Sequence, residues 1–141
     1  MRRIEVYEII EKFEKAKSKK ARIEVLQEYK DAWALRDVLR ATFDDSLQFN
    51  LPEGKPPFES NREESTPSSL HKRHKDIGWF VKGFKGDNLP SFKREQKFIQ
   101  LLESIHPKDA DLVCRMKDKD LKVKYLTKKL VQEALPDLIP E

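Results

Sequence analysis

Cysteine and glycine are scarce in this chain of 141 residues, with one Cys and 4 Gly. A single cysteine, Cys114, excludes an internal disulfide and suits a reducing compartment. No apolar run approaches the ~20 residues of a membrane span, and the N-terminus lacks the hydrophobic segment of a signal peptide. Charged residues, by contrast, make up 38% of the chain. This composition is typical of a soluble protein built from helices with charged outer faces.

Established catalytic motifs are also missing. The sequence has no phosphate-binding glycine loop, dinucleotide fingerprint, nucleophile elbow or zinc-hydrolase motif. Cys114 lies beside Val113 on an apolar stripe, which indicates a buried, inert thiol rather than a nucleophile. Asp44 and Asp45 are adjacent carboxylates that could hold magnesium, but no phosphate cradle accompanies them. A cap for the turn that follows is the simpler interpretation, and the sequence predicts no enzyme.

His71 and His74 are the nearest approach to a metal site. Their i, i+3 spacing places both imidazoles on one helical face, as half of a possible ligand set. The cations around them, Lys72, Arg73 and Lys75, disfavour a nearby dication. We therefore expect ordinary surface or partly buried histidines, and no metal or other cofactor.

Apolar residues recur at helical spacing through most of the chain. The pattern predicts helices over 3–17, 19–30, 31–41, 67–83, 92–105, 107–116 and 127–135. The second and third can also be read as one helix, because no glycine or proline separates them. Residues 118–125 form either an extended link or a frayed turn. The expected helix caps are Ser18, Asp31, Thr66, Ser91 and Thr127. The expected fold is all-α, a compact bundle of six or seven short helices without a sheet.

A proline-broken apolar stretch, 43–58, separates the two helical halves. Pro52, Pro56 and Pro57 exclude a helix or a long strand there. Its Phe and Leu side chains are too apolar for a solvated linker. We expect an irregular strap that fills a groove in the helical body. The predicted organisation is one domain, with N-terminal helices in 1–43, a proline-rich strap and polar loop in 44–66, and C-terminal helices in 67–141.

Positive charge is concentrated in two segments. Residues 67–97 carry eight Lys/Arg against three Asp/Glu, and residues 117–130 carry six against two. In the first segment aromatic residues alternate with the cations, a pattern that favours single-stranded nucleic acid, because cations contact phosphate and exposed rings stack on bases. In the alternative interpretation the aromatics are core residues and the lysines only solvate the helices. For Phe80, Phe92 and Phe98 the sequence favours the core.

The order of these segments resembles a family of small proteins of unknown function from tailed bacteriophages, notably contractile-tailed phages of marine bacteria and cyanobacteria. The matching stretches are Leu35–Leu39, Phe43–Pro57, Phe80–Gly83, Lys93–Pro107 and Leu126–Pro136. The resemblance implies a phage protein that acts in the cytoplasm of the infected bacterial host, alongside replication or transcription. It supplies no catalytic residues.

The predicted function is a non-enzymatic accessory protein that binds nucleic acid or a nucleoprotein complex through basic helical faces. The predicted contact residues are Lys72, Arg73, Lys75, Trp79, Lys82, Phe84, Lys85, Lys93, Arg94, Lys97, Lys124 and Lys128. The alternative is a protein-interaction module that modulates a host or phage protein through the strap or through the C-terminal peptide 135–139. An enzyme is the third class considered.

Overall fold

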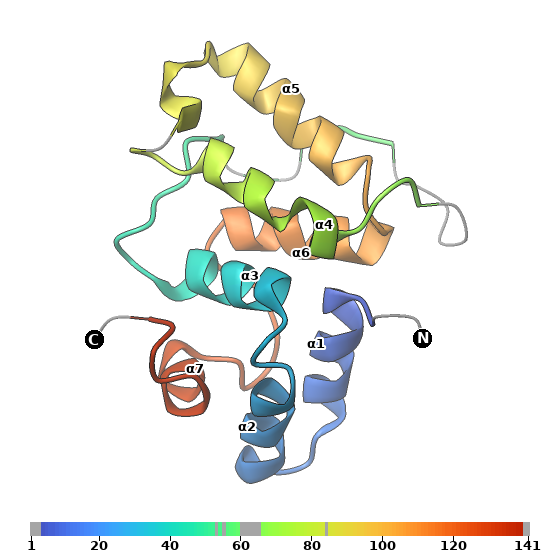
Figure 1. Ribbon diagram of the computed structural model, residues 1–141, viewed down its shortest axis with the longest axis vertical. Coiled ribbons are helices and arrows are strands. Elements are labelled where there is room, and N and C mark those ends of the chain that lie inside the picture. The colour runs from blue at the N-terminus through green and yellow to red at the C-terminus, as the bar shows by residue number, and fades with distance from the viewer. Residues whose placement is uncertain (1–3, 53, 55, 60–65, 84, 140–141) are drawn as a thin grey trace.

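The computed structural model describes residues 4–52, 54, 56–59, 66–83 and 85–139 (Figure 1). Within these ranges the chain forms seven α-helices and two 3₁₀ helices, and no strand. The all-α fold expected from the sequence is therefore confirmed. The helices are α1 (Val6–Lys15), α2 (Lys19–Glu28), α3 (Trp33–Phe43), α4 (Leu70–Arg73), η1 (His74–Phe80), η2 (Lys85–Asn88), α5 (Ser91–Leu102), α6 (Pro107–Lys117) and α7 (Lys128–Ala134).

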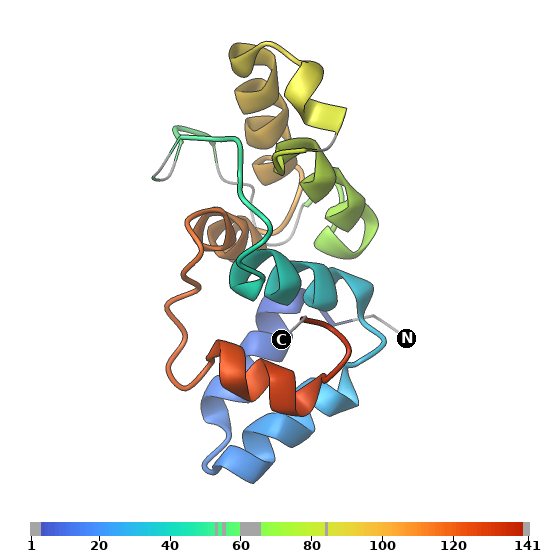
Figure 2. The same ribbon diagram turned by 90° about the vertical axis from the view of Figure 1, so that its left-hand side faces the viewer.

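Helix α6 occupies the middle of the molecule. It contacts α1, α3 and α5, and its Val113 and Met116 side chains are fully buried. Helices α4, η1 and α5 lie on one side of it along the long axis, whereas α1, α2 and α7 lie on the other (Figures 1 and 2). Helices from both halves of the chain, α1 and α3 from the first and α5 from the second, thus pack against one central helix.

The start of α6 follows from three consecutive residues. Pro107 occupies the first helical position, where its missing N–H costs nothing. The His106 ring caps the helix, since its Nδ1 accepts a hydrogen bond from the Lys108 N–H at 3.0 Å. Arg115 and Lys117 in the last turn have the sign that the helix dipole favours at a C-terminus. Pro107 was expected to open this helix, and it does.

Two of the predicted caps are confirmed. The Ser18 hydroxyl accepts from the Ala21 N–H at 3.1 Å and begins α2, so α2 and α3 have separate starts. The Thr127 hydroxyl accepts from the Leu130 N–H at 3.2 Å and begins α7. In both cases the hydroxyl satisfies a backbone donor that the first helical turn leaves unpaired.

The caps predicted at Asp31 and Ser91 are wrong. A turn in which the Ala32 N–H donates to the Tyr29 carbonyl places Ala32, not Asp31, at the start of α3. At α5 the capping position belongs to Pro90, and Ser91 is already helical. Proline is suited to that position because its ring holds the backbone extended without needing a donor.

Residues 67–83 do not form the single α-helix that was predicted. The Ser69 hydroxyl, not Thr66, caps one α-helical turn, which continues as the 3₁₀ helix η1. Residues 74, 77 and 80 are spaced by three, the period of a 3₁₀ helix, and Ile77 and Phe80 are buried. Gly78 weakens the α-helical alternative further.

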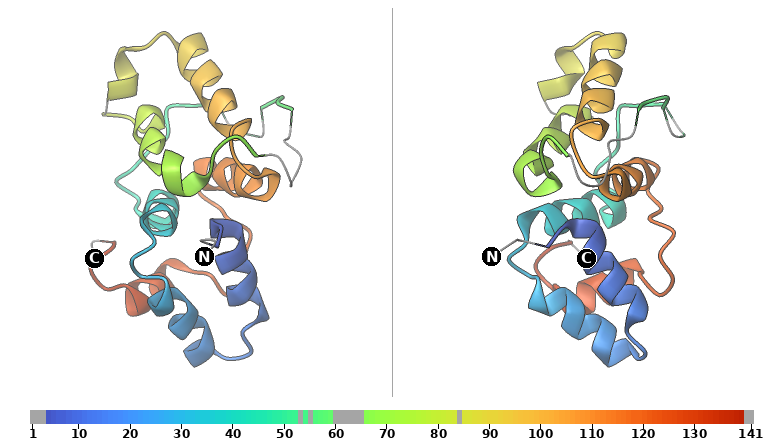
Figure 3. Two further views of the ribbon diagram at one scale, coloured as in Figure 1. Left: turned by 45° about the vertical axis from the view of Figure 1, so that its right-hand side comes forward. Right: turned by 90° about the vertical axis from the view of Figure 1, so that its right-hand side faces the viewer.

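The strap packs against the core as predicted. It leaves α3 and crosses behind α4 and η1 toward the ends of α5 and α6 (Figure 3). Phe49 pairs with Val81 in an isolated antiparallel bridge, in which the Asn50 N–H donates to the Phe80 carbonyl at 2.7 Å. The Phe and Leu side chains of 43–58 are partly buried against the core.

The C-terminal peptide folds back, so that Leu138 and Ile139 are buried, at 8% and 2% exposure. The apolar side chains of the tail and the strap therefore contribute to the core. In the described part of the chain no helix is both long and apolar enough to cross a membrane.

Candidate nucleic-acid interface

The first basic segment folds into adjoining elements on one side of α6. Helix α5 and the 3₁₀ helix η1 contact each other, and η2 connects them (Figure 1). Their shared interior holds the rings of Phe80 and Phe98, which meet edge to face at 5.2 Å. These two phenylalanines are buried, as predicted, and they hold the two cation-bearing elements together.

Five lysines of α4, η1, α5 and the turn after η1 are exposed. Together they are named the basic region: Lys72, Lys75, Lys82, Lys93 and Lys97. None of them forms an ion pair with another residue that the structure describes. The Lys97 ammonium lies 4.7 Å from the centre of the Trp79 ring, which connects α5 to η1 through a cation–π contact.

Arg73 belongs to the same elements but is paired. Its guanidinium lies 3.4 Å from the Asp76 carboxylate, and both side chains are well exposed. Exposed pairs of this kind are weak, so a phosphate can compete for Arg73.

Phe92 is the clearest departure from the predicted core. Its side chain is 66% exposed, although the sequence favoured burial. The reason is its position in the first turn of α5, two residues before the buried Arg94 and therefore about 200° away around the helix. Phe92, next to Lys93 in the sequence, thus offers an exposed ring, and it was not among the residues predicted to contact a ligand.

Arg94 does not belong to an exposed interface. It is only 8% exposed, and its guanidinium donates to three backbone carbonyl oxygens, those of Asn50 (2.8 Å), Gly86 (3.1 Å) and Leu89 (3.0 Å). It thereby joins the strap, η2 and α5. The prediction that Arg94 contacts phosphate is corrected, because these donors already have partners.

Phe84 lies outside the described residues, and for Lys85 only the backbone, at the start of η2, is described. The turn next to them is tightly packed. A side chain at Gly86 would put its Cβ 1.6 Å from the Trp79 carbonyl oxygen, so only glycine fits. This contact fixes the backbone that carries Trp79.

The two histidines, His71 and His74, contact different parts of the chain. His71 Nε2 lies 2.6 Å from the Ile4 carbonyl oxygen, and His74 Nδ1 lies 2.5 Å from the Asp37 carboxylate. A pocket of about 250 Å³ adjoins His74 and Asp37. The residues that the structure describes include no group of three or more His, Cys, Asp or Glu suited to a metal ion.

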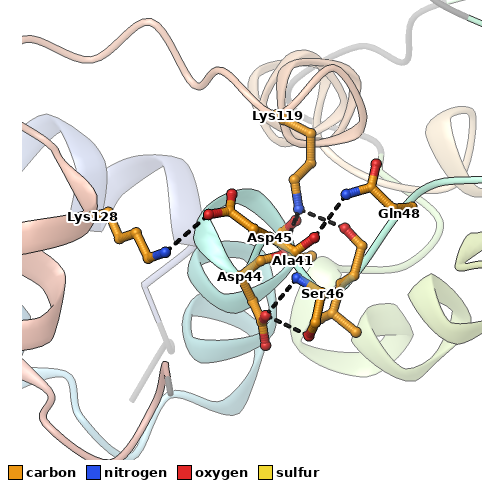
Figure 4. Close-up of polar contacts among 8 residues, drawn as sticks. Ala41, Asp44, Asp45, Ser46, Gln48, Lys119 and Lys128 are labelled. Atoms are coloured by element: carbon orange, nitrogen blue, oxygen red, sulfur yellow. Dashed lines mark hydrogen bonds and ion pairs between the residues drawn. The ribbon is translucent and has the colours of Figure 1, made fainter. Parts of the chain in front are cut away.

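Two lysines of the second basic segment, Lys117 and Lys119, are directed inward. Lys119 Nζ donates to three carbonyl oxygens, those of Ala41 (2.6 Å), Asp44 (2.9 Å) and Leu47 (2.8 Å), at the junction of α3 and the strap (Figure 4). Burial lowers the pKa of the Lys119 ammonium. Lys117 Nζ, which is buried, donates to the Pro52 carbonyl at 2.7 Å.

Lys128 is also partnered. Its ammonium lies 3.0 Å from the Asp45 carboxylate, so part of its charge is neutralised within the molecule (Figure 4). The neighbouring Asp44 is buried and accepts from the backbone and hydroxyl of Ser46. The hydroxyl bond is the main reason that the pKa of Asp44 is lowered. As expected, this carboxylate closes a turn.

Lys124 lies apart from the basic region. It belongs to the link 118–127, which descends from α6 to α7 on the side of the molecule away from α5 (Figures 2 and 3). Its ammonium is 5.0 Å from the centre of the Tyr125 ring. The two basic segments thus do not merge into one surface.

These observations define an all-α protein with exposed lysines and an exposed aromatic ring on one side of its central helix. By sequence, the chain belongs to a family of unknown function, DUF6433, whose match covers residues 9–123. A comparison with curated proteins finds no match.

Proposed function

We propose that this protein binds single-stranded nucleic acid, alone or within a nucleoprotein complex, through the basic region, and that it catalyses no reaction. The observation that carries the proposal is the exposed Phe92 beside lysines that have no ion-pair partner among the described residues. Phosphate supplies the missing counter-charge, and bases stack on exposed rings.

A merely solvated helix surface accounts for the lysines but not for Phe92. Exposing this ring to water forgoes the free energy that its burial would give. Trp79 lies next to Lys97, which brings an aromatic ring and a cation together. One ring–cation pair and a second exposed ring on neighbouring elements suit a strand with alternating bases and phosphates.

Binding of oligonucleotides tests the proposal. The informative variant replaces Lys75, Lys93 and Lys97 by Gln, and its control replaces three other exposed lysines, Lys15, Lys30 and Lys129, by Gln. Both variants lose the same charge. We expect the first to bind a single-stranded oligonucleotide about 10–100-fold more weakly at low salt, and the control to lose little. Equal losses would show that only net charge matters and would contradict the proposal.

Phe92→Ala separates stacking from charge. Loss of one stacked base weakens single-strand binding by about tenfold and leaves duplex binding nearly unchanged, because paired bases are not available to the ring. An equal effect on both forms would argue against stacking.

From the resemblance to phage proteins we propose that this activity takes place in the cytoplasm of an infected bacterium, as part of replication or transcription. Co-purification of the tagged protein with nucleic acid from infected cells, lost after nuclease treatment, is the expected result. A protein partner that persists after nuclease treatment would favour an interaction module instead.

A further inference from the structure

Arg22 on α2 differs from the other arginines that the structure describes. Its guanidinium has no oxygen partner among the described residues, and its carbon lies 3.8 Å from the centre of the Tyr125 ring. The other five pair with a carbonyl or carboxylate oxygen; they are Arg36, Arg40, Arg73, Arg94 and Arg115. A guanidinium stacked on a ring keeps its in-plane N–H donors free for a ligand.

Tyr125 is held in an unfavourable backbone conformation. Its φ is +69°, in the left-handed region that bulky residues rarely adopt, and its side chain is 51% exposed. The buried Leu126 and its turn, in which the Leu126 N–H donates to the Val123 carbonyl, hold the backbone there. Strain of this kind tends to persist at binding sites. Here it keeps the ring exposed beside Arg22 instead of in the core.

Lys124 completes the arrangement. Its ammonium lies 5.0 Å from the same ring, and among the described residues neither Lys124 nor Arg22 has an ion-pair partner. A planar fork of donors with a second cation close by matches the oxygens of a phosphate group.

We propose that Arg22, Lys124 and Tyr125 form a phosphate-binding site, separate from the basic region. Arg22 would donate in-plane hydrogen bonds to two phosphate oxygens, and Lys124 would supply the second charge. Tyr125 would hold the guanidinium flat. The phosphate can come from a polynucleotide backbone or from a small phosphorylated molecule, and the site does not depend on the function proposed for the basic region.

Arg36 offers a matched control. Its guanidinium also lies over an exposed ring, that of Trp33, at 5.4 Å, but its donors are taken by the Lys30 carbonyl and the Asp137 carboxylate. Arg22→Gln and Arg36→Gln therefore remove the same charge from similar surroundings. Only the first removes unpaired donors.

The experiment is an NMR titration of the full chain with inorganic phosphate at constant ionic strength. We expect saturable shifts of the Arg22 side-chain N–H and Tyr125 ring signals, about tenfold weaker binding in Arg22→Gln, and unchanged binding in Arg36→Gln. Shifts that chloride reproduces, or equal binding by wild type and Arg22→Gln, would overturn the site.

Tyr125→Asn tests the ring without relying on Arg22. Asparagine tolerates a positive φ better than tyrosine, so this variant should unfold at the same or a higher temperature while binding phosphate several-fold more weakly. Undiminished binding would overturn the role of the ring and with it the three-residue site.

A second titration with a short single-stranded oligonucleotide distinguishes the two sources. If Arg22→Gln weakens binding of both ligands, the site takes polynucleotide phosphate; if it weakens only inorganic phosphate, the ligand is a small phosphorylated molecule. If Arg22→Gln changes the affinity for neither ligand, the proposal is overturned. The oligonucleotide affinity of the variant at Lys75, Lys93 and Lys97 tests the basic region alone, so its outcome can be distinguished from that of Arg22→Gln.

Discussion

Residues 67–97 and 117–130 have similar charge, with eight Lys/Arg against three Asp/Glu and six against two, yet their cations point to different surroundings. In the first segment the five lysines of the basic region face solvent. In the second, Lys117 and Lys119 donate to carbonyl oxygens of the strap region, and Lys128 pairs with Asp45.

The difference lies in the backbone that surrounds each segment. The lysines of α5 stand on a regular helix, whose carbonyls are already hydrogen-bonded. Lys119 instead follows the end of α6 in a left-handed conformation, φ +63°, next to the last turn of α3 and the irregular strap. Those segments leave carbonyls without helical partners, and buried carbonyls need donors. A lysine near unpaired carbonyls becomes structural, whereas one on a regular helix stays available to a ligand.

The largest expected effect is on the pH dependence of the unfolding free energy, and it comes from the inward-facing carboxyl group of Asp109. Asp109 is fully buried; burial, together with the nearby Glu5 and Glu8 charges, raises its pKa to about 8. The folded protein then holds a proton that the unfolded chain releases above its ordinary pKa near 4. We expect the unfolding free energy to fall as pH rises from 5 to 8, by on the order of 4 kcal/mol from this group.

Asp109→Asn should remove that slope, because the amide does not titrate and can still accept from the Tyr7 N–H. Urea unfolding at pH 5 and pH 8 measures it. Asp111→Asn on the same helix, at a partly exposed carboxylate paired with Arg115, is the control and should keep the wild-type slope. Parallel profiles for wild type and Asp109→Asn would refute the assignment.

Arg94→Met tests the corrected role of the inward arginine. The substitution leaves the carbonyls of Asn50, Gly86 and Leu89 without their donor, and we expect a loss of about 3 kcal/mol in unfolding free energy. Arg73→Met, at an exposed pair, should change it by less than about 0.5 kcal/mol. Chemical denaturation compares them. Similar small losses would mean that Arg94 is free to serve a ligand after all.

Lys119→Met should cost about 2 kcal/mol, because three carbonyls at the α3–strap junction lose a charged donor. The matched control is Lys122→Met, since Lys122 lies in the same link, is exposed and also has a positive φ, +56°. Thermal unfolding of the two variants measures the difference. A neutral Lys119→Met would place this lysine with the outward-facing ones.

The smallest effect is expected at Lys128. Its pair with Asp45 is exposed, and a double-mutant cycle with Lys128→Ala and Asp45→Ala should give a coupling of less than about 0.5 kcal/mol. A coupling above 1 kcal/mol would mean that the Lys128–Asp45 pair stabilises the fold more than an exposed ion pair should.

Helix positions and side-chain caps were predictable because they depend on neighbouring residues. Apolar spacing gave α1 and α6, and the Ser18 and Thr127 hydroxyls begin helices as expected. The stripe of α5 also contained a usable signal: counting back by helical steps from Phe98 and Leu101 reaches Arg94, not Phe92. Phe92 could therefore have been assigned to the surface from the sequence.

The direction of the lysines was not predictable in the same way. Lys119 acts on carbonyls more than 70 residues away in the sequence, and Arg22 meets Tyr125 across a still longer interval. Nothing in the local pattern of 118–125 indicates these contacts. Such contacts depend on which carbonyl oxygens and rings the fold brings near each cation, and this is known only once the chain is folded.

The salt dependence of oligonucleotide binding tests the comparison most directly. Lys93→Gln with Lys97→Gln removes two outward cations, and Lys128→Gln with Lys129→Gln removes two from the other segment. We predict that the first pair lowers the slope of log K against log salt on a single-stranded oligonucleotide by about 1.4 and that the second leaves it near the wild-type value. Equal slopes for both double variants, or no measurable binding by the wild type at low salt, would contradict the account.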